Sequence, residues 1–274
     1  MLVNDVATLL LSTLFYQTVS AEWTHFFSIV LCMMALSIYI LYQMPESPSF
    51  LFDICEFDAS EAAYNYIAKF NGKKNHITVE PPMEESFGNV SIVTMEDKPD
   101  FNEMLQNPSF RLKLFLVIIF WIGVEFCFFT IGFHMKYLPG NIFQIVTLQG
   151  FVTAIAFSSG GIISKKLGIQ NTIATCFTMA TFGSYLMIKA PSSFELPLLI
   201  FTKMGVDCAY SQVMVYTTSE FPGYMTSKIL GICNVFSSLA GMMAPQIAEM
   251  DDPLPMWVCF TICFISMVGS VKNS

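Results

Sequence analysis

The sequence predicts an all-α membrane protein, and three observations lead to this fold class. Hydrophobic residues make up 54% of the 274-residue chain and charged residues only 12%, about half the charged share of ordinary soluble domains. Seven stretches stay apolar over about the 20 residues that a helix needs to cross a bilayer. The 27 Phe and 18 Met exceed what a single soluble core of this size can hide. Lipid is the solvent that accepts such a surface.

Each apolar stretch is predicted to be a helix, because backbone polar groups inside lipid must find partners within their own segment. An eighth stretch, 6–20, is apolar but short. The predicted membrane-spanning helices are 25–43, 112–135, 142–163, 171–190, 196–217, 229–248 and 254–271.

A polar segment, 45–108, interrupts the series and contains six of the thirteen prolines. Within it, Asp58–Phe70 is predicted to be one amphipathic helix. Asp58 and Glu61 have capping-box spacing, and Asn71-Gly72 fits a helix stop. The rest of the segment, including 75–99, is expected to be poorly ordered.

Basic residues predict how the chain is oriented in the membrane. If the polar segment is cytosolic and eight segments alternate, ten Lys and Arg fall inside and two, Lys136 and Lys189, fall outside. By the positive-inside rule both termini are then cytosolic. The net charge of −8 belongs to the same loop, because twelve of the 21 acids lie within 46–103. It therefore indicates no nucleic-acid partner.

Catalytic and metal-binding patterns are weak. Seven of the eight Cys lie inside apolar stretches without a CxxC pair, so no disulfide framework is expected. Cys259 and Cys263 share a helix face, where packing is favoured over metal binding. The sequence lacks a P-loop, GxSxG and HExxH, so we predict neither an enzyme nor a cofactor.

Four short motifs occur in order along the chain. They are Pro-Glu-Ser-Pro at 45–48, Leu-Pro-Gly-Asn-Ile-Phe at 138–143, Ser-Glu-Phe-Pro at 219–222 and Ala-Gly-Met-Met-Ala-Pro at 240–245. In order and spacing they resemble the PESPRWL, GGNIY and ELYPT…GGIIxP motifs of the organic cation/anion transporter branch of the major facilitator superfamily. Sugar porters share the first motif, so that motif alone would not separate the two branches.

The resemblance implies a major facilitator superfamily fold, represented by the C-terminal six-helix bundle and about two helices of the N-terminal half. Residues 1–44 would be a remnant of the N-terminal bundle, 45–108 a cytosolic loop with a short amphipathic helix, and 109–274 the C-terminal bundle. A complementary N-terminal helical half is therefore an expected partner, beside the lipid bilayer.

The resemblance also implies cytosolic gating motifs, some of them altered. The family's DRxGRR loop reads Ser-Lys-Lys-Leu-Gly-Ile-Gln at 164–170, and Ser49 stands where PESPR has Arg. The expected gating residues are Pro45, Glu46, Ser47, Pro48, Lys165, Lys166, Gly168, Glu220 and Pro222.

Small residues in the stretch 229–248 favour close helix packing. They are Gly231, Ala240, Gly241 and Ala244, and Pro245 is expected to break the helix near its outer end.

Ionisable residues at membrane depth are functional candidates, because they are costly there. Glu125 is central in its stretch and is expected to face the pathway. Lys203 and Asp207 share a helix face at i, i+4. They either neutralise each other structurally or line a pathway for a charged substrate or a coupling proton. His134, near the outer interface, is expected to be solvated.

Polar and aromatic residues complete the candidate substrate site. Ser238 and Thr153 stand at two positions where the family carries selecting charges, so the resemblance does not fix the substrate's charge. Aromatic and amide side chains line many ligand pockets, although aromatic residues in membrane helices more often serve packing alone. The remaining candidates are Phe128, Phe129, Gln149, Tyr210, Gln212 and Asn234.

The leading functional hypothesis is transport of a small organic solute by alternating access, as in a solute carrier. The alternative is a non-transporting half-transporter that assembles with or regulates another membrane protein. A seven-helix receptor is disfavoured by the long loop and the even helix count.

Overall fold

The computed structural model describes residues 23–72, 78, 83–86, 89–92, 100–138, 140–189, 191 and 194–273. The chain divides into two compact units, one built on 112–220 and 229–274 and the other on 27–111 and 221–228. The short predicted stretch 6–20 lies outside the described residues. The domain boundaries expected at 44/45 and 108/109 remain predictions.

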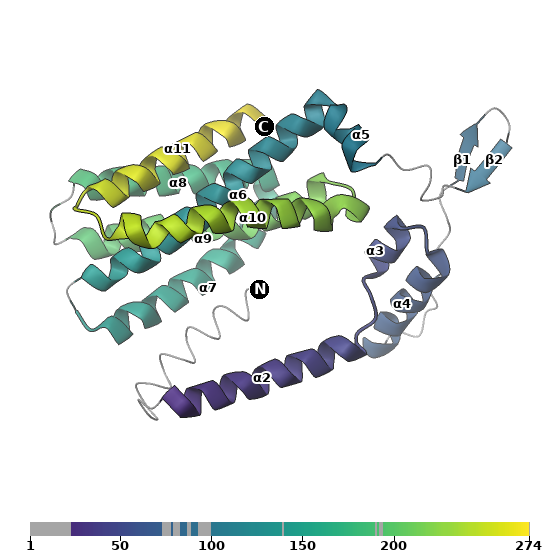
Figure 1. Cartoon of the computed structure of the whole chain (residues 1–274), viewed down its shortest axis with the longest axis horizontal. Coiled ribbons are helices and arrows are strands. Elements are labelled where there is room, and N and C mark those ends of the chain that lie inside the picture. The colour runs from purple at the N-terminus through teal and green to yellow at the C-terminus, as the bar shows by residue number, and fades with distance from the viewer. Residues whose placement is uncertain are drawn as a thin grey trace. The chain divides into compact units, whose positions relative to one another are not determined.

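The first unit is an all-α bundle of six long helices, as the fold-class prediction requires, and these helices lie side by side in Figure 1. α8 packs along both α9 and α11, and α7 packs against α9. The bundle helices are α6 Pro108–His134, α7 Ile142–Leu167, α8 Ile169–Lys189, α9 Glu195–Glu220, α10 Gly223–Ala248 and α11 Leu254–Asn273, with the 3₁₀ turn η2 Met135–Tyr137 after α6.

The second unit contains the apolar helix α2 and the short elements of the polar segment. The amphipathic helix predicted at Asp58–Phe70 is confirmed as α4, and Gly72 after it has φ +70°. The elements are α2 Trp23–Gln43, α3 Pro48–Asp53, α4 Phe57–Phe70, β1 Met83–Ser86, β2 Asn89–Ile92 and α5 Phe101–Gln106.

The polar segment differs from its prediction in two places. α4 begins one residue earlier, after Glu56, and no side-chain hydrogen bond caps it. The prediction of a capping box at Asp58 and Glu61 is therefore wrong, because both residues already lie inside the helix. β1 and β2 pair antiparallel, with Met83 opposite Ile92. This hairpin lies within 75–99, where the sequence predicted no helix or strand.

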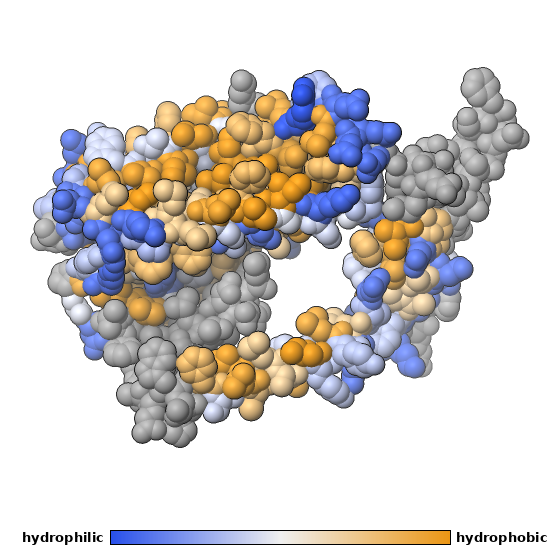
Figure 2. Space-filling model, in the orientation of Figure 1, coloured by the Kyte–Doolittle hydropathy of each residue, from blue (hydrophilic) through white to orange (hydrophobic). Residues whose placement is uncertain are grey.

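Among the residues that the structure describes, four helices are long and apolar enough to cross a membrane: Pro108–Tyr137, Gln144–Leu167, Gly223–Ala248 and Leu254–Val271. α8 and α9 have 21 and 26 residues, which is also enough to span, but they are less apolar. Figure 2 shows hydrophobic side chains over the middle of α10 and α11 and hydrophilic ones toward the helix ends. This distribution is that of a membrane-embedded bundle.

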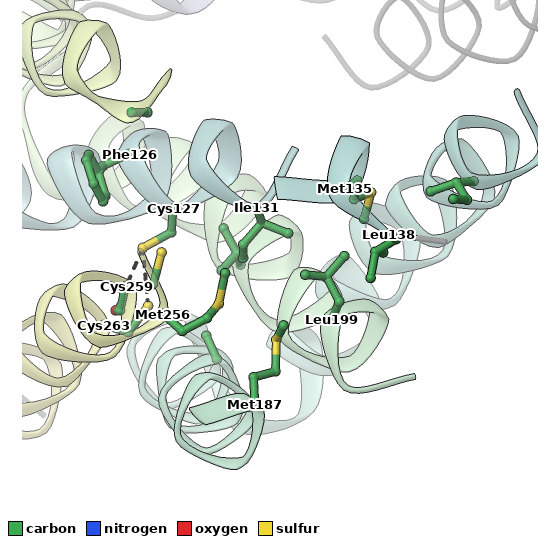
Figure 3. Close-up of a cluster of buried hydrophobic side chains, with 14 residues drawn as sticks. Phe126, Cys127, Ile131, Met135, Leu138, Met187, Leu199, Met256, Cys259 and Cys263 are labelled. Atoms are coloured by element: carbon green, nitrogen blue, oxygen red, sulfur yellow. Dashed lines mark hydrogen bonds between the residues drawn. The ribbon is translucent and has the colours of Figure 1, made fainter. Parts of the chain in front are cut away.

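The bundle core lies between α6, α8, α9 and α11. Cys127 and Ile131 of α6, Leu199 of α9, and Met256 and Cys259 of α11 are all buried there (Figure 3). Thioether and thiol side chains fill irregular gaps between helices. These Met and Cys residues thus serve as packing groups in the core.

Some of the small residues that were expected to allow close helix packing lie at such contacts, and others do not. A methyl group added at Gly205 of α9 would lie 2.9 Å from the backbone nitrogen of Ala180 on α8, so these backbones touch. On α10, Ala244 is fully buried and Gly241 faces α6, but Gly231 has no neighbour within 4 Å. The packing role expected for Gly231 is therefore wrong.

Two further expectations fail at the end of the bundle where α6 and α10 finish. α10 continues through Pro245 to Ala248. A proline in the last turn removes only one backbone hydrogen bond, so it does not stop the helix there. His134 is 8% exposed rather than solvated, and its ring lies 6.2 Å from that of Tyr137 in η2, centroid to centroid.

Two ion pairs join the ends of α6 to other helices of the bundle. Near its start, Lys113 pairs with Glu220 at the end of α9. After its end, Lys136 pairs with Glu249, which follows α10, at 2.9 Å. The start of α6 and the end of α9 therefore lie at the same end of the bundle.

Candidate functional site

A fully buried ion pair lies within α9. Lys203 and Asp207 are both 0% exposed, with Lys203 Nζ 3.0 Å from Asp207 Oδ1. From α7, the Thr153 hydroxyl donates a hydrogen bond of 2.6 Å to Asp207 Oδ2. Both oxygens of the carboxylate thus have partners, which is what a buried charge requires. The i, i+4 spacing in the sequence predicted the pair, but not the role of Thr153 in holding it.

An aromatic ring from α6 covers the lysine. Lys203 Nζ lies 4.1 Å from the centroid of the Phe128 ring, within the range of a cation–π contact. Phe128 itself is half-buried. The ammonium is therefore neutralised by Asp207 and shielded by Phe128.

Tyr210 is the centre of an aromatic cluster one turn beyond the ion pair on α9. Its ring lies 5.8 Å from that of Phe128, 6.0 Å from that of Trp121 and 6.2 Å from that of Phe157, centroid to centroid. The Trp121 indole N–H donates to the Thr217 hydroxyl at 3.0 Å. These contacts fix the rings at the distances that aromatic pairs prefer.

Glu125 borders this cluster on α6. The Tyr210 hydroxyl hydrogen-bonds the Glu125 carboxylate, and the Phe128 and Phe129 rings, 5.5 Å apart, follow on the same helix. Glu125 is half-buried. No Lys or Arg forms an ion pair with it among the residues that the structure describes. Within the described part of the chain, it is therefore a carboxylate with hydrogen bonding but without a counter-charge.

α10 passes close to Glu125. A methyl group added at Gly241 would lie 3.4 Å from Phe129 Cδ2 and 3.6 Å from Glu125 Cγ. Asn234 and Ser238 precede Gly241 by seven and three residues, on the same side of the helix, and both are exposed. These two predicted residues thus extend one face of α10 that begins beside Glu125.

The two predicted glutamines are placed differently. Gln149 of α7 is half-buried, and its Nε2 would lie 3.7 Å from a methyl group added at Gly132 of α6. Gln212 is 2% exposed and donates to the Ser211 hydroxyl at 3.2 Å. A methyl group at Gly160 of α7 would lie 2.7 Å from Gln212 Nε2. Gln212 thus belongs to the α7–α9 contact.

Comparison with known proteins gives the chain a set of relatives. Human organic cation/carnitine transporter 2 is 23% identical over 215 residues, and human solute carrier family 22 member 7 is 22% identical over 241 residues. Solute carrier family 22 member 15-like from Xenopus laevis is 24% identical over 234 residues. The relatives of this chain are solute carrier family 22 transporters. No family model matches the chain.

The matches cover most of this chain but less than half of each relative. They span 77%, 82% and 84% of the chain and 38%, 47% and 42% of the human carnitine, Xenopus and human member 7 transporters respectively. The relatives are named as transporters rather than enzymes. A membrane environment for this chain follows from that kinship and from its long apolar helices.

The solute carrier resemblance placed gating motifs at the ends of the helices. In the bundle, Lys165 and Lys166 are exposed in the last turn of α7. Gly168, with φ +83°, ends that helix by donating its N–H to Ser164 O at 2.9 Å. Glu220 forms the ion pair with Lys113, a partner that the sequence did not reveal.

The remaining motif residues lie in the second unit. Ser47 precedes Pro48, the first residue of α3, and the Ser60 hydroxyl of α4 donates to Pro48 O at 2.8 Å. Glu46 and Pro45 are exposed. The Pro222 carbonyl accepts the N–H groups of Met225 and Thr226 in the first turn of α10. The gating role of all these motif residues remains a prediction.

Proposed function

We propose that this chain forms part of a carrier for small organic cations, with Glu125 as the charge that attracts them. The observation that supports this is the charge balance of the site. Lys203 is neutralised by Asp207, whereas Glu125 has no basic partner among the described residues. Aromatic faces, here those of Phe129 and Tyr210, attract cations as well. The net attraction is therefore for positive charge.

The relatives support the same substrate class. One of them is named an organic cation/carnitine transporter, and a quaternary ammonium group is the kind of cation that aromatic side chains recognise. A soft organic cation suits a half-buried site better than a small inorganic ion, because it loses less hydration on entering.

The proposed mechanism is alternating access. In it, α6, α9 and α10 form one side of a pathway whose other side is a second helical half, supplied by another chain or by a longer form of this one. Rocking of the two halves exposes the site to each side in turn. A proton competes with the organic cation for Glu125, which provides a coupling ion.

Binding is tested with the full chain in lipid nanodiscs and radiolabelled tetraethylammonium. We expect saturable binding that benzoate, an organic anion, does not displace. E125Q, which removes the charge and keeps the shape, should weaken binding about tenfold or more, equivalent to about 1.4 kcal/mol.

E249Q is the matched control, because Glu249 is an exposed acid at the end of the bundle that pairs with Lys136. It should leave binding unchanged. Binding of benzoate in preference to tetraethylammonium, or equal loss in E125Q and E249Q, would contradict the assignment of Glu125. Uptake into liposomes by the isolated chain would show that no second half is needed.

The second candidate function is a non-transporting subunit that regulates another membrane protein. It is favoured by the altered cytosolic loop. Lys165 and Lys166 make no ion pair among the described residues, and the chain's single arginine is Arg111. Cation binding without flux, even when a complementary half is co-expressed, would support this second function.

A further inference from the structure

We propose that Cys176 and Cys208 form a redox modification site, in which an organic hydroperoxide converts the two thiols to a disulfide that joins α8 to α9. All eight cysteines of the chain are free thiols. Two pairs of sulfur atoms lie close together in the bundle, and this pair is the closer. The proposal concerns the thiols themselves and does not require transport.

The two sulfurs lie beside a close backbone contact between α8 and α9. The Sγ atoms of Cys176 and Cys208 are 3.0 Å apart, so about 1 Å of movement gives the bond length of a disulfide, about 2.05 Å. A methyl group added at Gly205 would lie 3.0 Å from the carbonyl oxygen of Cys176. The missing side chain at Gly205 thus lets the two helices approach closely.

The second pair provides a comparison within the same bundle. Cys127 of α6 and Cys263 of α11 lie 3.5 Å apart, sulfur to sulfur, as the dashed line in Figure 3 shows. Cys127 is also 3.9 Å from the backbone carbonyl of Cys259. Because its sulfurs must move farther, this pair should oxidise later than Cys176 and Cys208.

The chemistry balances with a hydroperoxide, a class that includes oxidised lipids. One thiol, reacting as thiolate, attacks an oxygen of ROOH; the O–O bond breaks, ROH leaves and the cysteine becomes a sulfenic acid. The second sulfur attacks the first, the S–O bond breaks and water leaves. Two thiols and ROOH thus give one disulfide, ROH and water. Both sulfurs are oxidised and the peroxide oxygens are reduced.

The disulfide between Cys176 and Cys208 would lie directly beside the buried ion pair of Lys203 and Asp207. Cys208 follows Asp207 on α9, and Cys208 Sγ would lie 3.2 Å from a methyl group at Gly160 of α7. A disulfide at Cys208 would therefore fix the segment of α9 that carries Lys203 and Asp207 against α8. A reductant would restore its freedom.

The test treats membranes containing the full chain with cumene hydroperoxide. Remaining thiols are alkylated with N-ethylmaleimide after unfolding, and digested peptides are identified by mass spectrometry. We expect a linked Cys176–Cys208 peptide, lighter than its two parts by two hydrogens, that dithiothreitol removes. It should form before any Cys127–Cys263 link. The linked peptide should be lost in both C176S and C208S.

C233S is the matched control, because Cys233 is also a buried cysteine, and the linked peptide should persist in it. Exposed Cys32 reports that oxidant has reached the protein. The proposal is wrong if Cys32 is oxidised while Cys176 and Cys208 are both recovered alkylated. It is equally wrong if either thiol is linked to a different cysteine. The wild-type measurement decides even if a variant fails to fold.

Discussion

The Thr153 hydroxyl on α7 donates a 2.6 Å hydrogen bond to the carboxylate of Asp207 on α9. The acid that neutralises Lys203 is thereby held by a second helix. Since both residues are almost completely buried, the bond links two helices where no water can replace it.

T153V should lower the thermal stability of the chain. Valine keeps the shape but removes the donor and leaves one carboxylate oxygen unsatisfied, which costs about 1–3 kcal/mol. Thermal unfolding in detergent measures the loss. T178V is the control, because the exposed Thr178 hydroxyl only bonds its own helix at Ala174 O. Equal effects of the two variants would contradict a special role for Thr153.

K203M should destabilise the bundle more than the double variant K203M/D207N. The single change leaves a buried carboxylate without its counter-charge, at a cost of about 3–5 kcal/mol. The double change removes both charges, so part of the lost stability is recovered. A double-mutant cycle on unfolding midpoints gives the coupling between the residues. Additive effects would mean that the two side chains do not interact.

G205A should lower the stability of the bundle, whereas G231A should not. A Cβ at Gly205 meets the backbone of Ala180 at 2.9 Å, and overpacking of this kind costs about 1–3 kcal/mol. A Cβ at Gly231 meets nothing within 4 Å. That change should be neutral or slightly stabilising, because alanine is the better helix former. Both are compared by thermal unfolding, and a stable G205A would show that α8 and α9 are farther apart.

Cysteine labelling should place Lys166 and Lys189 on opposite sides of the membrane. They end α7 and α8 respectively, and consecutive spanning helices alternate in direction. In a C32S/C55S background, which removes the two cysteines that are not buried, K166C should react with a membrane-impermeant maleimide only from the cytosolic side and K189C only from the other. Labelling of both from one side would contradict the alternation.

Membrane helices were the part of the fold that the sequence predicted best. The apolar stretches 142–163 and 254–271 became Ile142–Leu167 and Leu254–Asn273, because lipid imposes a length and a composition that a sequence displays directly. The hairpin of β1 and β2 was missed, since Met83–Ser86 contains two glutamates and no clear alternation. Polar strands of four residues carry little signal.

The candidate site was predictable only where its residues are neighbours in the chain. Lys203 and Asp207 lie one helical turn apart, and Glu125 is conspicuous as a charge in an apolar run. Lys113 and Glu220 are 107 residues apart, so their pairing depends on helix order in space. Phe157 lies among Ala, Ser and Gly residues of α7, and only the packing of α7 on α9 brings it to Tyr210.

The buried pair on α9 also limits how this protein can evolve. A gene that loses Lys203 first passes through a form with an orphaned acid, and one that loses Asp207 first passes through an orphaned base. Either intermediate is penalised, so the two codons should change together or not at all. Close descendants of this sequence should therefore carry both charges or neither.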